Sequence, residues 1–219
     1  MPYVPVFHHA TGEWRARWRG RIHAGALAVV VPAGVLLVWL ASGPLATVAT
    51  TVYAVSLVAL FGTSSAYHLL TRRPRVQRVM QRVDHSMVFV LIAGTYTPVC
   101  LVALPRPVGI PLLAVVWLIA CLGIVLKAAW VARRTSAALY LVLGWIVLVV
   151  APWLVHQVGL ATLTLYAVGG VVFTVGAVLF AMRRPRLRPE VFGFHEVWHA
   201  MTVVAVACQF AATALVVGG

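Results

Sequence analysis

The sequence predicts an all-α polytopic membrane protein, and three observations support this fold class. Hydrophobic residues make up 63% of the 219-residue chain and charged residues only 10%, and the mean hydropathy of +0.99 is too high for a soluble domain. Seven apolar runs have about the 20 residues that a helix needs to cross a bilayer. Basic residues cluster between alternate runs. We therefore expect a multi-pass protein of the cell membrane, with a basic segment at 1–21 and a seven-helix transmembrane domain at 22–217.

Each expected span ends where the sequence stops favouring a helix. In chain order the spans are 22–42, 45–70, 84–104, 109–132, 136–156, 160–182 and 194–217. The segments between them contain helix breakers or paired arginines, namely Gly43-Pro44, Pro74, Pro105 with Pro107, Arg133-Arg134, Gly159, and Pro185 with Pro189. The first span follows basic residues, as a signal peptide would, but its apolar run is long and lacks a convincing cleavage site. We therefore assign it as the first transmembrane helix.

The arginines also predict the orientation of the chain in the bilayer. Basic residues crowd the amino-terminal segment, the predicted loop 71–83, the Arg133-Arg134 turn and the loop 183–193, whereas the alternate loops carry only Arg106. By the positive-inside rule the amino terminus is cytoplasmic and, after seven spans, the carboxyl terminus is outside. The 17 basic residues, against four acidic ones, therefore indicate contact with anionic headgroups of the inner leaflet and argue against nucleic-acid binding.

Ionisable residues inside the spans gather at one predicted depth. They lie at the cytoplasmic ends of the second, third and seventh spans: His68, Asp84, His85, His195, Glu196 and His199. Because an ionisable group at mid-span costs about 2.5–3.5 kcal/mol, each of them is a candidate for function. The other histidines, His8, His9, His23 and His156, are interpreted as ordinary interfacial residues.

The spacing of the histidines favours a metal site. His195 and His199 are four residues apart, so they project from one helix face, as two imidazoles that bind one metal do. His68 is the best candidate for a third ligand. Three protein nitrogens with one open position are typical of catalytic zinc, which lowers the pKa of water to about 7. Asp84 could then deprotonate that water, and Ser64, one turn before His68, could contact the water or the substrate.

Each of these residues also has a simpler interpretation. Histidines at helix ends are often interfacial, and Asp84 could be the amino-terminal cap of the third span. Ser64 could be a small residue that allows two helices to approach closely. The segment from His195 to His199 also fits the H-E-x-x-H pattern of zinc proteases, in which Glu196 would be the general base. The pattern is therefore also compatible with an intramembrane metalloprotease.

Three segments of the chain form a recognisable set. They are Ser64–His68, Asp84–Ser86 leading into Thr95–Pro98, and Phe194–His199. In this order they resemble the signature segments of the haemolysin III family, a bacterial branch of the progestin and adipoQ receptor superfamily, which includes adiponectin receptors. The resemblance covers essentially the whole chain. It implies that His68, His195 and His199 bind zinc, that Asp84 is the acid near the water, and that Ser64 is the serine of the first segment.

We accordingly expect a zinc-dependent membrane hydrolase that cleaves a lipid amide or ester at the cytoplasmic side of the membrane. A ceramide-like substrate is implied by the superfamily resemblance. A different possibility is a receptor-like or structural membrane protein in which zinc is structural. The last alternative is a haemolysin-type pore. Polar residues that gather at one end, however, do not line a path through the membrane. The expected partners are a membrane lipid as substrate and the anionic headgroups of the inner leaflet.

Overall fold

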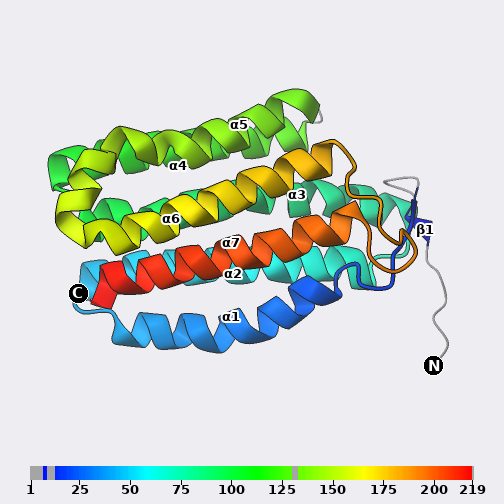
Figure 1. Ribbon diagram of the computed structural model, residues 1–219, viewed down its shortest axis with the longest axis horizontal. Coiled ribbons are helices and arrows are strands. Elements are labelled where there is room, and N and C mark those ends of the chain that lie inside the picture. Colours follow the sequence, from blue (N-terminus) through cyan, green and yellow to red (C-terminus); the bar gives the residue numbers. More distant parts are fainter. Residues whose placement is uncertain (1–6, 9–12, 130–132, 219) are drawn as a thin grey trace.

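The computed structural model describes residues 7–8, 13–129 and 133–218, with side chains except at 7–8, 13–14 and 133–138. These residues form a helical bundle (Figure 1). Its helices are α1 (Arg21–Leu40), α2 (Pro44–Leu70), α3 (Pro74–Pro98), α4 (Arg106–Ala128), α5 (Arg133–Trp145), α6 (Ala151–Ala181) and α7 (Phe194–Gly218). The strands β1 (Phe7–His8) and β2 (Glu13–Trp14) form a short antiparallel pair. The all-α prediction is confirmed apart from this pair.

Six helical stretches among the described residues are long and apolar enough to cross a membrane. They are Arg21–Leu40, Pro44–Leu70, Pro74–Ala103, Arg106–Ala128, Leu139–Ala181 and Phe194–Gly218. The fifth stretch has 43 residues, about twice the number that one crossing needs. Gly159 interrupts it with a non-helical conformation (φ 76°, ψ 167°). In Figure 1 the chain reverses direction between the rods labelled α5 and α6.

The third helix begins earlier than predicted. Residues 71–83 were expected to form a loop, but α3 starts at Pro74 and carries most of the arginines of that segment. Proline suits the first turn of a helix because its missing N–H would have no intrahelical partner there. Asp84 consequently lies ten residues inside α3. The interpretation of Asp84 as the cap of this helix is therefore wrong.

Small residues allow the helices to pack closely, and one helix changes type near its end. At Gly94 on α3, a Cβ atom would lie 2.3 Å from Oγ of Ser56 on α2, so only glycine allows this approach. Pro98 ends α3, and the π-helix η1 (Val99–Ala103) follows it. The helix takes a wider turn directly after Pro98, which cannot donate the regular backbone hydrogen bond. The short 3₁₀-helix η2 (Ile146–Val150) links α5 to α6.

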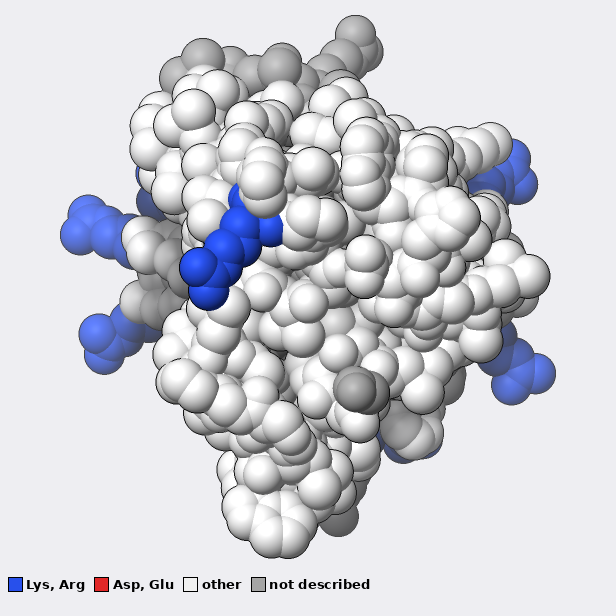
Figure 2. Space-filling model, turned by 90° about the vertical axis from the view of Figure 1, so that its left-hand side faces the viewer, with Lys and Arg blue, Asp and Glu red and all other residues white. Residues whose placement is uncertain are grey.

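The two ends of the bundle differ in character. At one end α2 and α6 finish and α1, α3 and α7 begin; we call this the histidine end (right in Figure 1). The opposite end, where α1 and α7 finish and α2 begins, is the far end. Figure 2 looks onto the far end and shows a largely uncharged face, with most of the basic side chains in view projecting around the outline.

Candidate metal centre

The structure brings the three predicted histidines together. His68 comes from the last turn of α2, and His195 and His199 come from the first turns of α7. One ligand atom from each side chain lies within 4.8 Å of the other two. The ring centroids are 4.9 Å apart for His68 and His195, 5.0 Å for His68 and His199, and 4.7 Å for His195 and His199. The three residues are 0%, 8% and 2% exposed, so the cluster is buried.

This cluster fits a tetrahedral metal ion. Zinc binds imidazole nitrogen at 2.0–2.1 Å, which places neighbouring ligand nitrogens about 3.4 Å apart. Nδ1 of His199 is buried and has no hydrogen-bond partner in the described part of the chain. A buried polar atom without a partner is costly, and a bound group would remove that cost.

Asp84 and Ser64 form a second polar group on the neighbouring helices. Ser64 is buried on α2, one turn before His68, and its hydroxyl lies within hydrogen-bonding reach of the Asp84 carboxyl group. Asp84 does not join the set of ligand atoms within 4.8 Å of one another. The adjacent His85 is half-buried, and its carbonyl oxygen accepts a hydrogen bond from the Tyr140 hydroxyl at 2.7 Å. This proximity of Asp84 to Ser64 was not predicted from the sequence.

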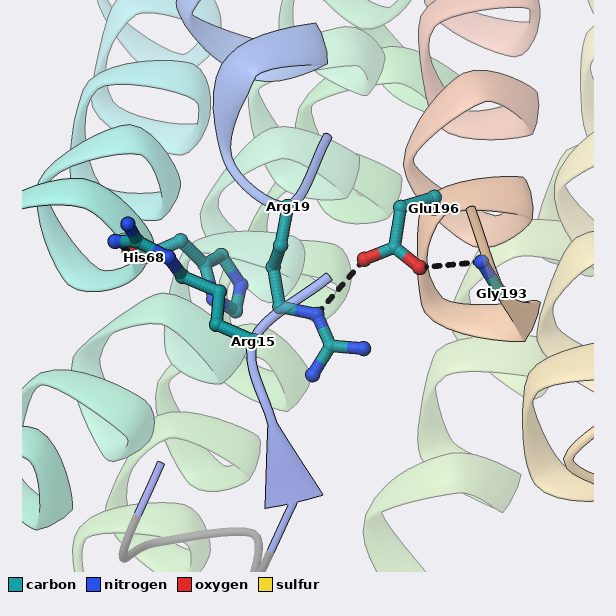
Figure 3. A network of polar contacts seen from close by, with 5 residues as sticks. All are labelled: Arg15, Arg19, His68, Gly193 and Glu196. Atoms are coloured by element: carbon teal, nitrogen blue, oxygen red, sulfur yellow. Dashed lines mark hydrogen bonds and ion pairs between the residues drawn. The ribbon is translucent and has the colours of Figure 1, made fainter. Parts of the chain in front are cut away.

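Glu196 faces the chain segment that precedes α1. Nε of Arg19 donates a hydrogen bond to Oε1 of Glu196 at 2.8 Å, and the Gly193 amide donates to Oε2 at 2.7 Å (Figure 3). The two side chains of this ion pair are only 4% and 0% exposed. Both carboxylate oxygens of Glu196 are therefore engaged in local structure, which favours a structural role over that of a general base.

The segment 15–20 covers the end of α2 that carries His68. Nη1 of Arg15 donates to the His68 carbonyl oxygen at 2.8 Å, and the amides of Arg17 and Trp18 donate to carbonyl oxygens in the connection between α6 and α7. Gly20 adopts φ +82°, and a Cβ atom there would lie 2.6 Å from Cβ of His68. The basic character of this segment was predicted from its sequence, but its packing against the cluster was not.

His23 is a functional candidate that the sequence interpretation missed. It was expected at the interface, yet its side chain is only 3% exposed. Its ring stacks on that of His199, with a centroid distance of 3.9 Å and an interplanar angle of 13°. The spacing of three or four residues along the first span would have indicated that His23 is buried. The buried residues of α1 share one helix face: His23, Ala26, Val30, Gly34 and Leu37.

Comparison with known proteins supports the resemblance carried by the three signature segments. Residues 15–210 match the family described as haemolysin-III related. The chain belongs to the haemolysin III family. It is 34% identical to Hemolysin-3 of Bacillus cereus over 167 residues, which cover 75% of this chain and 73% of that protein. It is 32% identical to the Hemolysin-3 homolog of Bacillus subtilis (strain 168) over 165 residues, which cover 74% of each.

Family membership and the six apolar helical stretches together make this a multi-pass membrane protein, as the composition predicted. The cell membrane is the location consistent with both observations. The three-histidine cluster lies at one end of this membrane protein, close to where α2 finishes and α7 begins.

Proposed function

We propose that this protein is a zinc-dependent integral membrane hydrolase that cleaves an amide or ester bond of a lipid. The observation that carries the proposal is the buried cluster of His68, His195 and His199, whose ligand atoms lie within 4.8 Å of one another. Zinc, when bound, supplies a Lewis acid that polarises a carbonyl oxygen and lowers the pKa of water to about 7. A ceramide-like amide is the substrate that the superfamily resemblance implies.

In this proposal Asp84 and Ser64 handle the proton. Asp84 accepts the proton of the water that attacks the carbonyl carbon, and then donates it to the leaving amine or alkoxide. The Ser64 hydroxyl, which lies within reach of the carboxyl group, fixes the orientation of Asp84. His68 and Ser64 are one helical turn apart, so α2 would align the metal ligand with the proton-transfer pair.

We further propose seven spans with the amino terminus in the cytoplasm and the carboxyl terminus outside. The interruption at Gly159 supports two crossings within the stretch Leu139–Ala181. An odd number of crossings is also supported by the bundle, in which α1 begins at the histidine end and α7 finishes at the far end (Figure 1). Residues 1–21 would then be cytoplasmic, residues 22–217 would form the transmembrane domain, and the arginines would contact anionic inner-leaflet headgroups.

A second candidate is a receptor-like or structural protein in which zinc is structural. The burial of all three histidines favours it, because structural zinc sites are closed whereas catalytic sites keep one position open. A protease and a pore have less support. Glu196 is engaged by Arg19 and Gly193, unlike a protease base. Against a pore, the buried arginine, glutamate and histidines gather at one end rather than along a path through the membrane, although the relatives are named hemolysins.

Metal analysis combined with a lipid-hydrolysis assay tests the proposal. We expect purified wild-type protein to hold about one zinc ion per chain, and His68→Ala, His195→Ala and His199→Ala to lose it. The matched control is His156→Ala, an exposed histidine three residues before Gly159, which should retain full occupancy. Equal zinc content in all variants would remove the proposed ligand set.

Replacement of the proton-transfer acid separates the two candidates. If zinc is catalytic, Asp84→Asn should retain zinc and lower turnover of a fluorescent short-chain ceramide by about 100-fold or more, as expected for loss of a general base. If zinc is structural, loss of the metal should lower the unfolding temperature, and no zinc-dependent turnover of lipid amides or esters should be found in the wild type.

A further inference from the structure

His23 is buried with its polar atoms unsatisfied. Its side chain is 3% exposed. Neither ring nitrogen has a hydrogen-bond partner of good geometry among the described residues, although the ring lies near the backbone of His199. Native proteins rarely bury a polar group without a partner, and such a group requires an explanation. A ligand that enters the site would supply the missing partner.

His23 does not belong to the proposed set of metal ligands. Its ring is nearly parallel to that of His199, at 13° and a centroid distance of 3.9 Å. A nitrogen ligand directs its lone pair in the plane of its ring, so two stacked parallel rings cannot both direct lone pairs at one ion 2.0–2.1 Å away. The ligand atoms that lie close together are those of His68, His195 and His199. His23 therefore lies beside the cluster with its own hydrogen-bonding capacity available.

The surroundings of His23 hold its ring in a fixed position. The ring lies between His199 and Phe61, which it meets edge to face at a centroid distance of 5.0 Å. It is close enough to interact electrostatically with both His195 and His199. A group bound at the three histidines would therefore be near this imidazole. An imidazole locked by rings on two sides loses little rotational entropy when it forms a hydrogen bond.

We propose that His23 binds the polar group of the lipid, through a hydrogen bond from a ring N–H of its neutral imidazole to the carbonyl oxygen of the acyl chain. This inference rests on the proposed function, because it places the scissile carbonyl at the three-histidine cluster. His23 would then select acyl lipids that present a carbonyl acceptor at this depth. Phe61 would contribute by positioning the ring.

The test uses the full chain in detergent, loaded with Co²⁺ as a spectroscopic replacement for zinc. Octanohydroxamic acid is the probe, because it is an acyl analogue that binds a metal with an open position, and its binding shifts the visible spectrum of cobalt. His23→Phe keeps an aromatic ring at this position, slightly larger than imidazole, and has no ring nitrogen. We expect it to retain cobalt stoichiometry and the spectrum without probe, and to bind the probe about ten-fold more weakly, as for loss of one hydrogen bond.

Two further variants complete the comparison. His156→Phe, the matched control at an exposed position, should bind the probe as tightly as the wild type. If His23→Phe does not fold, His23→Gln and His23→Met replace it, because glutamine keeps an N–H donor and methionine does not. We expect tighter probe binding by the glutamine variant, and equal affinities of the two would overturn the proposal.

The remaining outcomes are also decisive. Probe affinity of His23→Phe equal to that of the wild type would overturn the inference and leave His23 as a packing residue, while the proposed function would stand. Loss of cobalt from a folded His23→Phe would overturn it as well, since His23 would then hold the metal. A wild type that binds no cobalt would remove the proposed function and, with it, this inference.

Discussion

The histidine end and the far end of the bundle use similar apolar helices but bury different kinds of polar side chain. At the histidine end, the buried polar side chains include the Arg19–Glu196 ion pair and four histidines. At the far end, Figure 2 shows a largely uncharged face, and the connection between α1 and α2 contains Gly43, where an added Cβ atom would have nothing within 4 Å. The buried polar side chains toward the far end are hydroxyls, such as those of Thr50, Thr162 and Thr213. Burial of charged groups and imidazoles costs more, so their concentration at the histidine end indicates that the chemistry of this protein lies there.

This difference also explains the fold of the amino-terminal segment. Residues 15–20 carry hydrogen-bond donors to the end of α2, to the connection between α6 and α7, and to Glu196. These contacts give buried acceptors the partners that water would otherwise supply. The segment is thus part of the polar end rather than a tail, and changes at matched positions of the two ends should have unequal effects.

The largest contrast concerns the side of the membrane on which each end lies. Arg72 follows α2 at the histidine end, and Arg106 is the first residue of α4 at the far end. Both side chains are exposed. In a background with Cys100, Cys121 and Cys208 replaced, Arg72→Cys should react with a membrane-impermeant maleimide only in inside-out vesicles. Arg106→Cys should react only in right-side-out vesicles, because the proposed topology keeps the basic connections in the cytoplasm and places the start of α4 outside. Labelling of both from one side would contradict the proposed topology.

The next contrast concerns the buried ion pair. Glu196→Ala removes the acceptor of the Arg19 hydrogen bond and of the Gly193 amide. Removal of one partner of a buried ion pair costs about 3–5 kcal/mol of unfolding free energy, because a charge stays buried without its counter-charge. Arg106→Ala, an exposed position at the far end, should change the unfolding free energy little. Unfolding by SDS in mixed micelles measures both.

A double variant tests whether that loss reflects the pair itself. Arg19→Leu combined with Glu196→Leu removes both charges, so it should be more stable than Glu196→Ala despite carrying more changes. If the double variant lost as much unfolding free energy as the two single variants together, Arg19 and Glu196 would act independently.

The sequence allowed the helices and the three-histidine cluster to be predicted because both depend on local or periodic signals. Apolar length determined most spans, and α7 was predicted to within one residue. The four-residue spacing of His195 and His199 follows from helix geometry alone. His68 could be added because topology placed the end of α2 at the same depth.

The features that were missed depend on packing between segments far apart in the sequence. Arg19 and Glu196 are 177 residues apart, and no local pattern indicates that they pair. The stack of His23 on His199 likewise depends on how α1 meets α7. The start of α3 was misplaced because arginines suggested a loop, although long basic side chains are tolerated on a helix that emerges into the headgroup region.

The smallest contrast compares two glycines that both have a positive φ but differ in ψ and in environment. Gly20 and Gly43 both precede a helix, with φ 82°, ψ −21° at Gly20 and φ 86°, ψ 161° at Gly43. For alanine, the left-handed conformation of Gly20 costs about 1 kcal/mol, whereas the conformation of Gly43 lies in a region that is essentially restricted to glycine and costs about 1–3 kcal/mol. At Gly20 the new Cβ would also lie 2.6 Å from Cβ of His68, whereas at Gly43 nothing lies within 4 Å. Overpacking of this kind adds about 1–3 kcal/mol.

Gly20→Ala and Gly43→Ala should therefore lose comparable amounts of unfolding free energy, about 2–4 and about 1–3 kcal/mol, but only the loss at Gly20 includes the contact with His68. Because the displaced atom is Cβ of a proposed metal ligand, Gly20→Ala should also release bound zinc faster to a chelator, while Gly43→Ala should match the wild type. A loss in Gly20→Ala of only about 1 kcal/mol, the cost of its backbone conformation alone, would mean that the segment 15–20 moves away from α2 at no cost, and the close packing at the histidine end would then not constrain the cluster. A larger loss without a change in zinc release would mean that the backbone near His68 yields while the imidazole stays in place.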